Sequence, residues 1–175
     1  PIVLPEAPLF SDYALEQLDL SKGPAYNETE QYWLNQFKGS DHLLNLPTDF
    51  SRPALRTYKS HREDFTLGSV LTEEIKKLGK STGSSLVTTL LAAFEVFLSK
   101  LTGQDEVIVG LPAAGQPATG NYRLVGHCVN LLALRSFPKG DITFKAYLKQ
   151  RRTDVMDAYD HQLYTFGSLL KKLNI

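Results

Sequence analysis

Cysteine, methionine and tryptophan each occur only once in this sequence of 175 residues. Because Cys128 is the single cysteine, an internal disulfide and a zinc site built from several cysteines are both excluded. An excess of charge of one sign is also lacking, since 19 Lys and Arg residues balance 19 Asp and Glu residues. The chain therefore has no electrostatic footprint for nucleic acid or for an anionic membrane.

Long hydrophobic runs are lacking as well. No apolar stretch reaches membrane-spanning length, and the first residues do not resemble a signal peptide. No segment repeats at a fixed period. These absences, together with the single cysteine, predict a soluble protein of the cytoplasm, a reducing compartment.

The composition that remains is typical of a folded domain. Hydrophobic residues make up 42% and charged residues 22%, which excludes disordered and fibrous classes, and the length suits one domain. The chain starts at Pro1 without an initiator Met, and residues 167–175 resemble a helix without a stop signal. We therefore expect a segment of a longer protein.

Hydrophobic periodicity predicts alternating helices and strands. Helices are expected over 27–38, 73–79, 84–101 and 143–160, and strands over 57–67, 106–109 and 125–134. Residues 111–122 are expected to form a long loop. The helix over 84–101 is so apolar that we expect burial on most sides against a sheet. This alternation predicts an α/β fold with a two-layer sandwich architecture.

Catalytic motifs are not evident. His127 and Cys128 are adjacent, but neighbouring strand residues face opposite ways, so a nucleophile and base pair is not expected. Asp157 and His161 have the spacing of a metal pair, yet a capping or ion-pair role is favoured. The glycine-rich stretch 110–120 lacks the pattern of a phosphate-binding loop.

Three short strings stand out from this background. Residues 10–17 read Phe-Ser-Asp-Tyr-Ala-Leu-Glu-Gln and place an acid, Asp12, at the start of a helix. Asn130 is the one amide in the apolar strand over 125–134 and must form hydrogen bonds or face a polar cavity. Residues 161–166 read His-Gln-Leu-Tyr-Thr-Phe and predict a connecting turn.

These strings, in this order, resemble motifs of the condensation domains of nonribosomal peptide synthetases. The first resembles the family motif Tyr-x-Asp-Tyr-Ala-x-Trp-Gln, with Phe10 and Glu16 as departures. The second resembles a Gly-x-Phe-Val-Asn strand, with Cys128 in place of phenylalanine. The third is similar to His-Gln-Asp-x-Pro-Phe, with Leu163 and Thr165 as departures. Residues 32–53 and 102–110 are also similar to family stretches, so the resemblance covers essentially the whole chain.

The resemblance implies a chloramphenicol acetyltransferase-like fold with a mixed β-sheet and packed helices. Such domains join two carrier-bound acyl or aminoacyl groups by an amide bond in a tunnel between two lobes. The family's catalytic motif of two adjacent histidines is absent, so residues 1–175 are expected to be a single domain, the C-terminal lobe. This lobe alone is expected to be inactive and to supply no catalytic residue.

The resemblance also implies a substrate-binding wall, for which we name Asn130, Gly126, Asp12 and Tyr13, with residues 111–122 as a floor. No metal or directly bound cofactor is expected, because the phosphopantetheine arm is delivered by a carrier protein. Expected partners are peptidyl or acyl carrier proteins, the N-terminal lobe and a neighbouring adenylation domain. The lobe face left exposed predicts a possible homo-oligomer.

Three alternatives remain open at this point. Relatives that epimerise or cyclise share the fold, although residues 12–14 and 32–33 look more like plain condensation. The second alternative is a non-catalytic lobe that docks a carrier protein or an adenylation domain. The third alternative is a lobe of an acyltransferase that uses coenzyme A.

Overall fold

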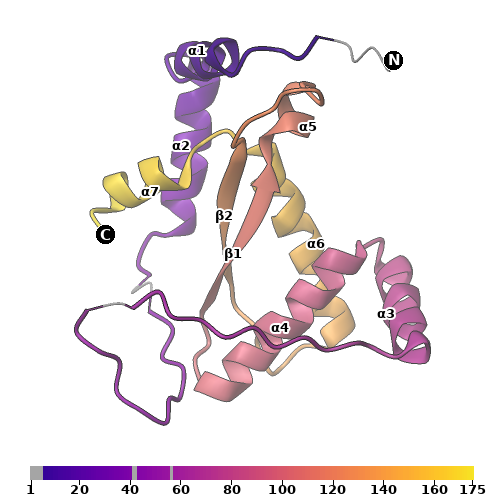
Figure 1. The fold of residues 1–175 in the computed structure, drawn as a ribbon. Coiled ribbons are helices and arrows are strands. Elements are labelled where there is room, and N and C mark those ends of the chain that lie inside the picture. The colour runs from indigo at the N-terminus through magenta and orange to yellow at the C-terminus, as the bar shows by residue number, and fades with distance from the viewer. Residues whose placement is uncertain (1–5, 41–42, 56) are drawn as a thin grey trace. The chain divides into compact units, whose positions relative to one another are not determined.

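The protein is described by a computed structural model that covers residues 6–40, 43–55 and 57–175, in which four helices precede the first strand (Figure 1). The helices are α1 (Phe10–Leu20), α2 (Pro24–Gln36), α3 (Ser69–Thr82), α4 (Leu86–Thr102), α5 (Gly115–Thr119), α6 (Phe144–Asp160) and α7 (Phe166–Leu173). The strands are β1 (Val107–Ala114) and β2 (Val129–Ser136). In the described part of the chain no single helix is long and apolar enough to cross a membrane. Only α3 and α4 together, bent by 100°, reach that length and composition.

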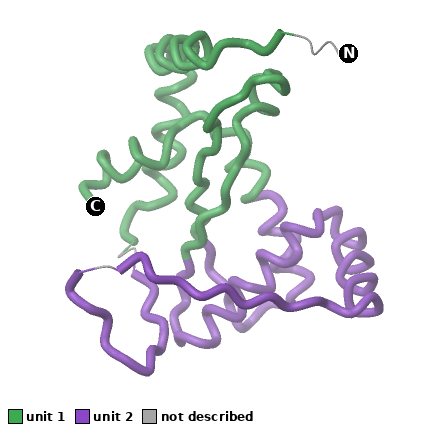
Figure 2. The backbone as a smooth tube through the Cα atoms, viewed as in Figure 1, with its two compact units in different colours: residues 1–42, 108–135, 154–175 green, residues 43–107, 136–153 purple. Residues whose placement is uncertain are grey.

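The chain divides into two compact units (Figure 2). Unit 1 contains residues 1–42, 108–135 and 154–175, and therefore α1, α2, α5, α7 and nearly all of both strands. Unit 2 contains residues 43–107 and 136–153, and therefore α3, α4 and the first part of α6.

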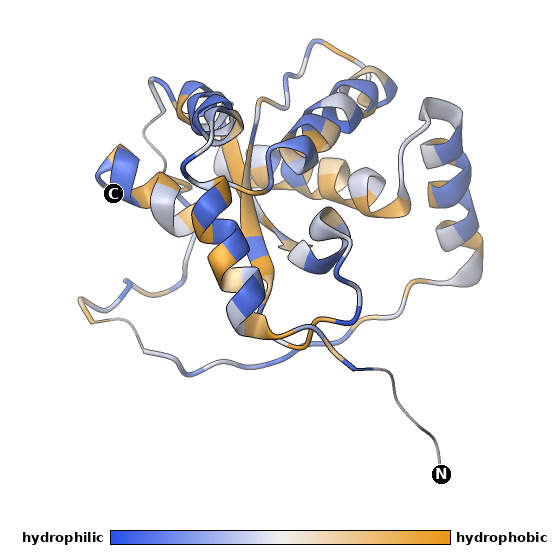
Figure 3. Ribbon diagram, turned by 90° about the horizontal axis from the view of Figure 1, so that it is seen from above, coloured by the Kyte–Doolittle hydropathy of each residue, from blue (hydrophilic) through white to orange (hydrophobic). Residues whose placement is uncertain are grey.

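The two strands pair in an antiparallel sheet. Ser136 Oγ donates to the Val107 carbonyl at 3.1 Å, while the Gly115 amide donates to the Cys128 carbonyl at 2.6 Å. Residue numbers therefore increase along one strand in the direction in which they decrease along the other, as in an antiparallel pair. Both strands are apolar along most of their length (Figure 3).

Both strands differ from the expected bounds. β1 continues to Ala114 and is followed by α5, so the predicted long loop over 111–122 was wrong in its first part. β2 begins at Val129 rather than Val125, because the chain bends at Gly126. An apolar pattern alone does not show where the hydrogen-bonded ladder starts.

The long helices of the sequence prediction are confirmed. Ser85 caps α4 by accepting a hydrogen bond from the Thr88 amide, and Gly103 ends it with a φ of 71°. α6 matches its predicted range closely. The predicted start of α2 at residue 27 was wrong, since Gly23 and Pro24 form its N-terminus.

Two further helix ends were also mispredicted. α3 begins at Ser69, one turn before the expected start at Glu73. α7 does have a stop signal, because Asn174 adopts a left-handed conformation with a φ of 59° directly after Leu173.

The core of unit 2 lies where α4 faces α6. Ala92, Tyr147 and Leu148 are its buried centre, and the partly buried Leu78, Val96 and Phe144 pack against them. A buried ion pair between Glu95 and Arg151 crosses this core, with Glu95 0% and Arg151 2% exposed. Its Nε–Oε2 and Nη2–Oε1 distances are both 2.9 Å.

The opposite side of α4 is exposed, which corrects the prediction of burial on most sides. Phe94 and Phe97 are 49% and 54% exposed, and their rings stack at 6.4 Å. The exposed apolar residues of this face are Leu86, Leu90, Phe94, Phe97 and Leu101. Periodicity identified the helix but not how many of its sides are covered.

The predicted strand over 57–67 is not formed. In this segment Arg62 pairs with Asp64, and His61 pairs with Glu63. Side chains two residues apart lie on the same side of an extended backbone, so these pairs indicate that the segment is extended. It has no ladder partner in the described structure, and its side chains are exposed. A strand pattern becomes a strand only when a neighbouring strand supplies hydrogen bonds.

Candidate functional site

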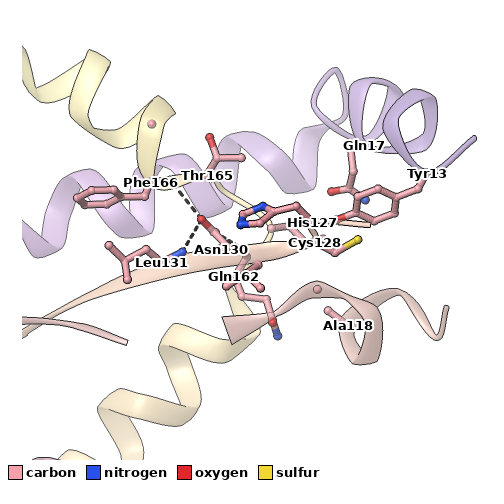
Figure 4. Close-up of a pocket in the computed structure, with 14 residues that line it drawn as sticks. Tyr13, Gln17, Ala118, His127, Cys128, Asn130, Leu131, Gln162, Thr165 and Phe166 are labelled. Carbon is pink, nitrogen blue, oxygen red and sulfur yellow. Dashed lines mark hydrogen bonds between the residues drawn. The ribbon is translucent and has the colours of Figure 1, made fainter. Parts of the chain in front are cut away.

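A cavity of about 430 Å³ lies within unit 1 (Figure 4). α1, α5, the first residues of β2 and the segment leading into α7 surround it. The lining side chains that can form hydrogen bonds are Tyr13, Gln17, His127, Asn130, Gln162 and Thr165. No described residue of the lining is Asp, Glu, Lys or Arg. The cavity therefore suits an uncharged, amide-bearing or acyl group better than an ion.

Asn130 holds one edge of this cavity. Its Nδ2 donates to the carbonyl oxygens of Gln162 and Tyr164 at 2.7 and 2.8 Å. Its Oδ1 accepts from the amides of Leu131 and Phe166 at 2.9 and 3.1 Å (Figure 4). All four hydrogen-bonding positions of the side-chain amide are thus used. This confirms that the amide in the apolar strand bonds to a neighbouring loop.

The same loop is held from the other side by α2. Trp33 Nε1 donates to the His161 carbonyl at 2.8 Å, and the Tyr32 ring stacks on the His161 ring at 3.9 Å. The Tyr164 hydroxyl donates to Glu30 Oε2 at 2.9 Å. Burial is the main cause that raises the pKa of the Tyr164 hydroxyl, and this hydrogen bond to Glu30 is the second cause. Residues 161–166 are therefore fixed in position between α2 and β2.

α1 contributes Tyr13 and Gln17, which lie four residues apart and so share one face of the helix. The Tyr13 hydroxyl lies against Gly115, where an added Cβ would be 3.1 Å from it and 2.5 Å from the Cys128 carbonyl. Only glycine fits at that position. Burial, with smaller contributions from Cys128 and Glu16, raises the pKa of the Tyr13 hydroxyl.

Gln17 has an unpaired hydrogen-bond donor in this site. Its Nε2 is buried and is the only buried side-chain nitrogen or oxygen in the described residues without a hydrogen-bond partner. Leaving such a donor unpaired costs about 1–3 kcal/mol.

A second cavity of about 400 Å³ lies within unit 2, where Lys100, Lys139 and Tyr147 are among its lining residues. It includes none of the three strings singled out by sequence. The cavity in unit 1 collects side chains from all three and is the better candidate.

The family model for the condensation domain matches residues 1–175 of this chain. This chain belongs to the condensation-domain family. Tyrocidine synthase 3 of Brevibacillus parabrevis is 40% identical over 166 residues, which are 95% of this chain and 3% of that protein. The chain thus spans only a small part of the curated relative it matches.

Solved structures agree with this membership at the level of the fold. The first condensation domain of the calcium-dependent antibiotic synthetase, solved with a substrate analogue, superposes with a TM-score of 0.82 at 18% identity, covering 99% of this chain and 40% of that chain. The X-domain from teicoplanin biosynthesis, solved in complex with OxyB, has a TM-score of 0.89 at 20% identity, covering 100% and 40%. The expected chloramphenicol acetyltransferase-like α/β fold is confirmed.

Two of the four residues named for substrate binding line the cavity of this condensation-domain chain. Tyr13 and Asn130 do so, whereas Gly126 and Asp12 are not among its lining residues. Gly126 lies under the Phe10 ring, which occupies the space that a Cβ would need. Asp12 is exposed in the first turn of α1, as its position in the string indicated. The role of all four in substrate binding stays a prediction.

Gln17, His127 and Gln162 are cavity residues that the sequence analysis did not name as a site. A signal existed for Gln17, because it ends the first string four residues after Tyr13. His127 was considered only as a partner of Cys128, and no hydrogen bond joins the two in the described structure. Gln162 carried no signal, since its place depends on how the loop is held.

The preference for a capping role at Asp157 and His161 is confirmed. His161 Nδ1 lies 2.7 Å from the Asp157 carbonyl oxygen at the end of α6. Within the described residues no group of three or more His, Cys, Asp or Glu side chains is arranged to hold a metal ion.

Proposed function

We propose that this chain forms one wall of the reaction tunnel in a condensation domain of a peptide synthetase. In the reaction, the amine of one carrier-bound group attacks the thioester carbonyl of the other. The C–N bond forms, the C–S bond breaks, and the donor carrier keeps a free thiol. The observation that carries the proposal is the uncharged cavity beside the Asn130 clamp, in a chain that matches the condensation domain throughout.

The Asn130 side chain suits positioning rather than proton transfer. The cavity presents Tyr13, Gln17 and His127, while Asn130 is fully engaged in holding the loop. A rigid wall that aligns two tethered reactants supplies acceleration through proximity. We place the family's paired histidines in an N-terminal lobe outside residues 1–175, which we assign to the C-terminal lobe.

The phosphopantetheine arm would reach this wall from a carrier protein in the cytoplasm. The absence of Lys and Arg from the described lining supports this over coenzyme A, whose phosphates favour basic side chains. Carrier proteins and an adenylation domain are the proposed partners.

The test is a condensation assay with the synthetase polypeptide that contains this chain, a carrier loaded with an acyl group and a second carrier loaded with an amino acid. We expect the amide product by mass spectrometry, and no product above background from the 175-residue chain alone. Product from the chain alone would refute its assignment as a partial lobe. No product from the intact polypeptide would refute the condensation function.

A second candidate is a docking platform without catalysis. It is favoured by one observation, that the X-domain with a TM-score of 0.89 was solved bound to another protein, OxyB. Carrier-protein binding by the intact polypeptide, measured by calorimetry, together with an absent amide product would support the platform.

A further inference from the structure

α1 is weakly attached to the rest of unit 1. It contains no buried residue, and its N-cap residue Leu9 provides no side-chain hydrogen bond. Its outward side is apolar yet exposed, with Leu15 and Leu18 at 61% and 55%. Tyr13 and Gln17 are its contacts with the cavity. Phe10 also packs over Gly126, but no residue of α1 is fully buried, and such a helix can shift at lower cost than a buried one.

Two side chains of this helix bring unused hydrogen-bonding capacity to the cavity. Asn130 is saturated, with two hydrogen bonds donated and two accepted. Gln17 Nε2, by contrast, is buried without a partner, and the Tyr13 hydroxyl makes no hydrogen bond to a described residue. Native structures leave few buried donors unpaired, and each one that remains needs an explanation.

The chemistry of the missing acceptor follows from the lining. The described lining residues carry no carboxylate, ammonium or guanidinium group and include one imidazole, that of His127, so a charged ligand group would find at most one counter-charge there. An amide N–H pairs with a carbonyl oxygen at little desolvation cost. The complementary group is therefore the carbonyl of an uncharged amide, whether in a pantetheine arm or in an acylated amino acid.

We propose that Gln17 is a ligand-binding residue whose side-chain amide donates to a carbonyl of the carrier-borne chain. This inference rests on the proposed function and adds a residue and a ligand group to it. Because Nε2 is covered by protein atoms, α1 moves slightly when the ligand binds, which its weak attachment permits.

The first measurement uses NMR on the polypeptide that contains this chain, with ¹⁵N-labelled glutamine side chains. Two probes separate the sources of the carbonyl: pantetheine for the arm, and N-acetylalanine methylamide for the acyl group. We expect at least one probe to move the Gln17 side-chain NH₂ resonance and to leave that of Gln31, exposed on α2, in place. If neither probe moves the Gln17 resonance, the inference is wrong.

The second measurement compares the dissociation constants of the responding probe for three variants. Gln17→Leu and Gln17→Glu both remove the donor at similar size, and we expect each to weaken binding about 3- to 10-fold. The matched control, Gln31→Leu, makes the first of these changes at an exposed helical site and should leave binding unchanged. Gln17→Leu should unfold at the same or a higher temperature, because it removes an unpaired buried donor. Unchanged binding in both Gln17 variants would overturn the proposal.

The condensation assay on the same proteins separates the two ideas. With two loaded carriers, Gln17→Leu is expected to raise KM more than it lowers kcat, since the hydrogen bond acts in binding. A probe that moves the Gln17 resonance in a polypeptide without condensation activity would refute the proposed function and support this inference. Normal condensation activity with a Gln17 resonance that neither probe moves would support the proposed function and refute this inference.

Discussion

Asn130 shows how one side chain determines the shape of a site. Four hydrogen bonds join it to the backbone of its own strand and of the loop 162–166, which forms part of the cavity wall. The backbone groups it serves lie at a part-buried position, where water is a poor substitute. The Asn130 side-chain amide therefore has a structural role, because its four hydrogen bonds fix its position before any substrate binds.

Replacing Asn130 with leucine, which has similar size, should lower the free energy of unfolding by about 2–4 kcal/mol, because two carbonyls and two amides lose their partner. Urea unfolding measures this. Asn35→Leu, at an exposed position of α2, is the control and should change stability little. If Asn130→Leu and Asn35→Leu were both as stable as wild type, the hydrogen bonds of Asn130 would contribute nothing to stability.

The buried pair of Glu95 and Arg151 is the other residue-scale feature. The carboxylate accepts two hydrogen bonds from the guanidinium and one from the Tyr147 hydroxyl at 2.7 Å. Burial, with the nearby Glu95 charge as the next cause, raises the pKa of the Tyr147 hydroxyl. Such a network is expensive to break on one side only.

We expect Glu95→Gln to cost about 3–5 kcal/mol of unfolding free energy, since it removes the buried carboxylate charge that the Arg151 guanidinium contacts. The double change Glu95→Leu with Arg151→Met should recover most of that loss, because no charge then remains buried. A double-mutant cycle by urea unfolding tests both statements. Additive losses in the double variant would contradict this account.

At the scale of elements, the connection between α2 and α7 depends on an ionised carboxylate. Glu30 accepts hydrogen bonds from Lys172 Nζ at 3.0 Å and from the Tyr164 hydroxyl at 2.9 Å. The hydrogen bond from Lys172 is the main cause that holds the pKa of Glu30 below its ordinary value of 4.5. The folded state therefore favours the charged form of this group.

It follows that the stabilisation from Glu30 is complete above the unfolded pKa of 4.5 and is lost as the pH falls through the lower folded pKa. Wild type and Glu30→Gln should thus differ in unfolding free energy at neutral pH, and the difference should shrink on acidification. Urea unfolding across the acid range measures it. Glu28→Gln, on the exposed side of the same helix, is the control. A difference that grows on acidification would reverse the assigned sign.

Helices were more predictable from sequence than strands at this scale. α4 and α6 follow a local period and local caps such as Ser85 and Gly103, so their positions need no distant partner. The segment 57–67 has a strand-like composition but no neighbour in the described structure with which to pair. Strand formation depends on chain that is distant in sequence, and that information is not local.

At the scale of the whole molecule, one side of α4 presents apolar side chains to solvent. Five large apolar side chains at helical spacing are left to solvent there. Apolar surface of this kind promotes association. The chain covers about 40% of the length of the two solved chains that share its fold.

The 175-residue chain by itself should therefore self-associate as its concentration rises. Replacing Phe94 and Phe97 with lysine should lower the weight-average mass toward that of a monomer in sedimentation equilibrium. Gln31→Lys with Gln150→Lys adds the same charge at exposed polar sites and controls for repulsion. A wild-type chain that stays monomeric at high concentration would contradict the prediction.

The sequence by itself determined which segments become the long helices, that Asn130 must be bonded, and to which family the chain belongs, because periods, caps and motif order are local properties. Only the tertiary structure decided that Tyr13, Asn130 and the segment leading into α7 surround one cavity, and that the Nε2 atom of Gln17 is buried without a hydrogen-bond partner. It likewise left one side of α4 uncovered. Burial and hydrogen-bond pairing depend on which distant segments meet, and the pattern of a single segment does not contain that information.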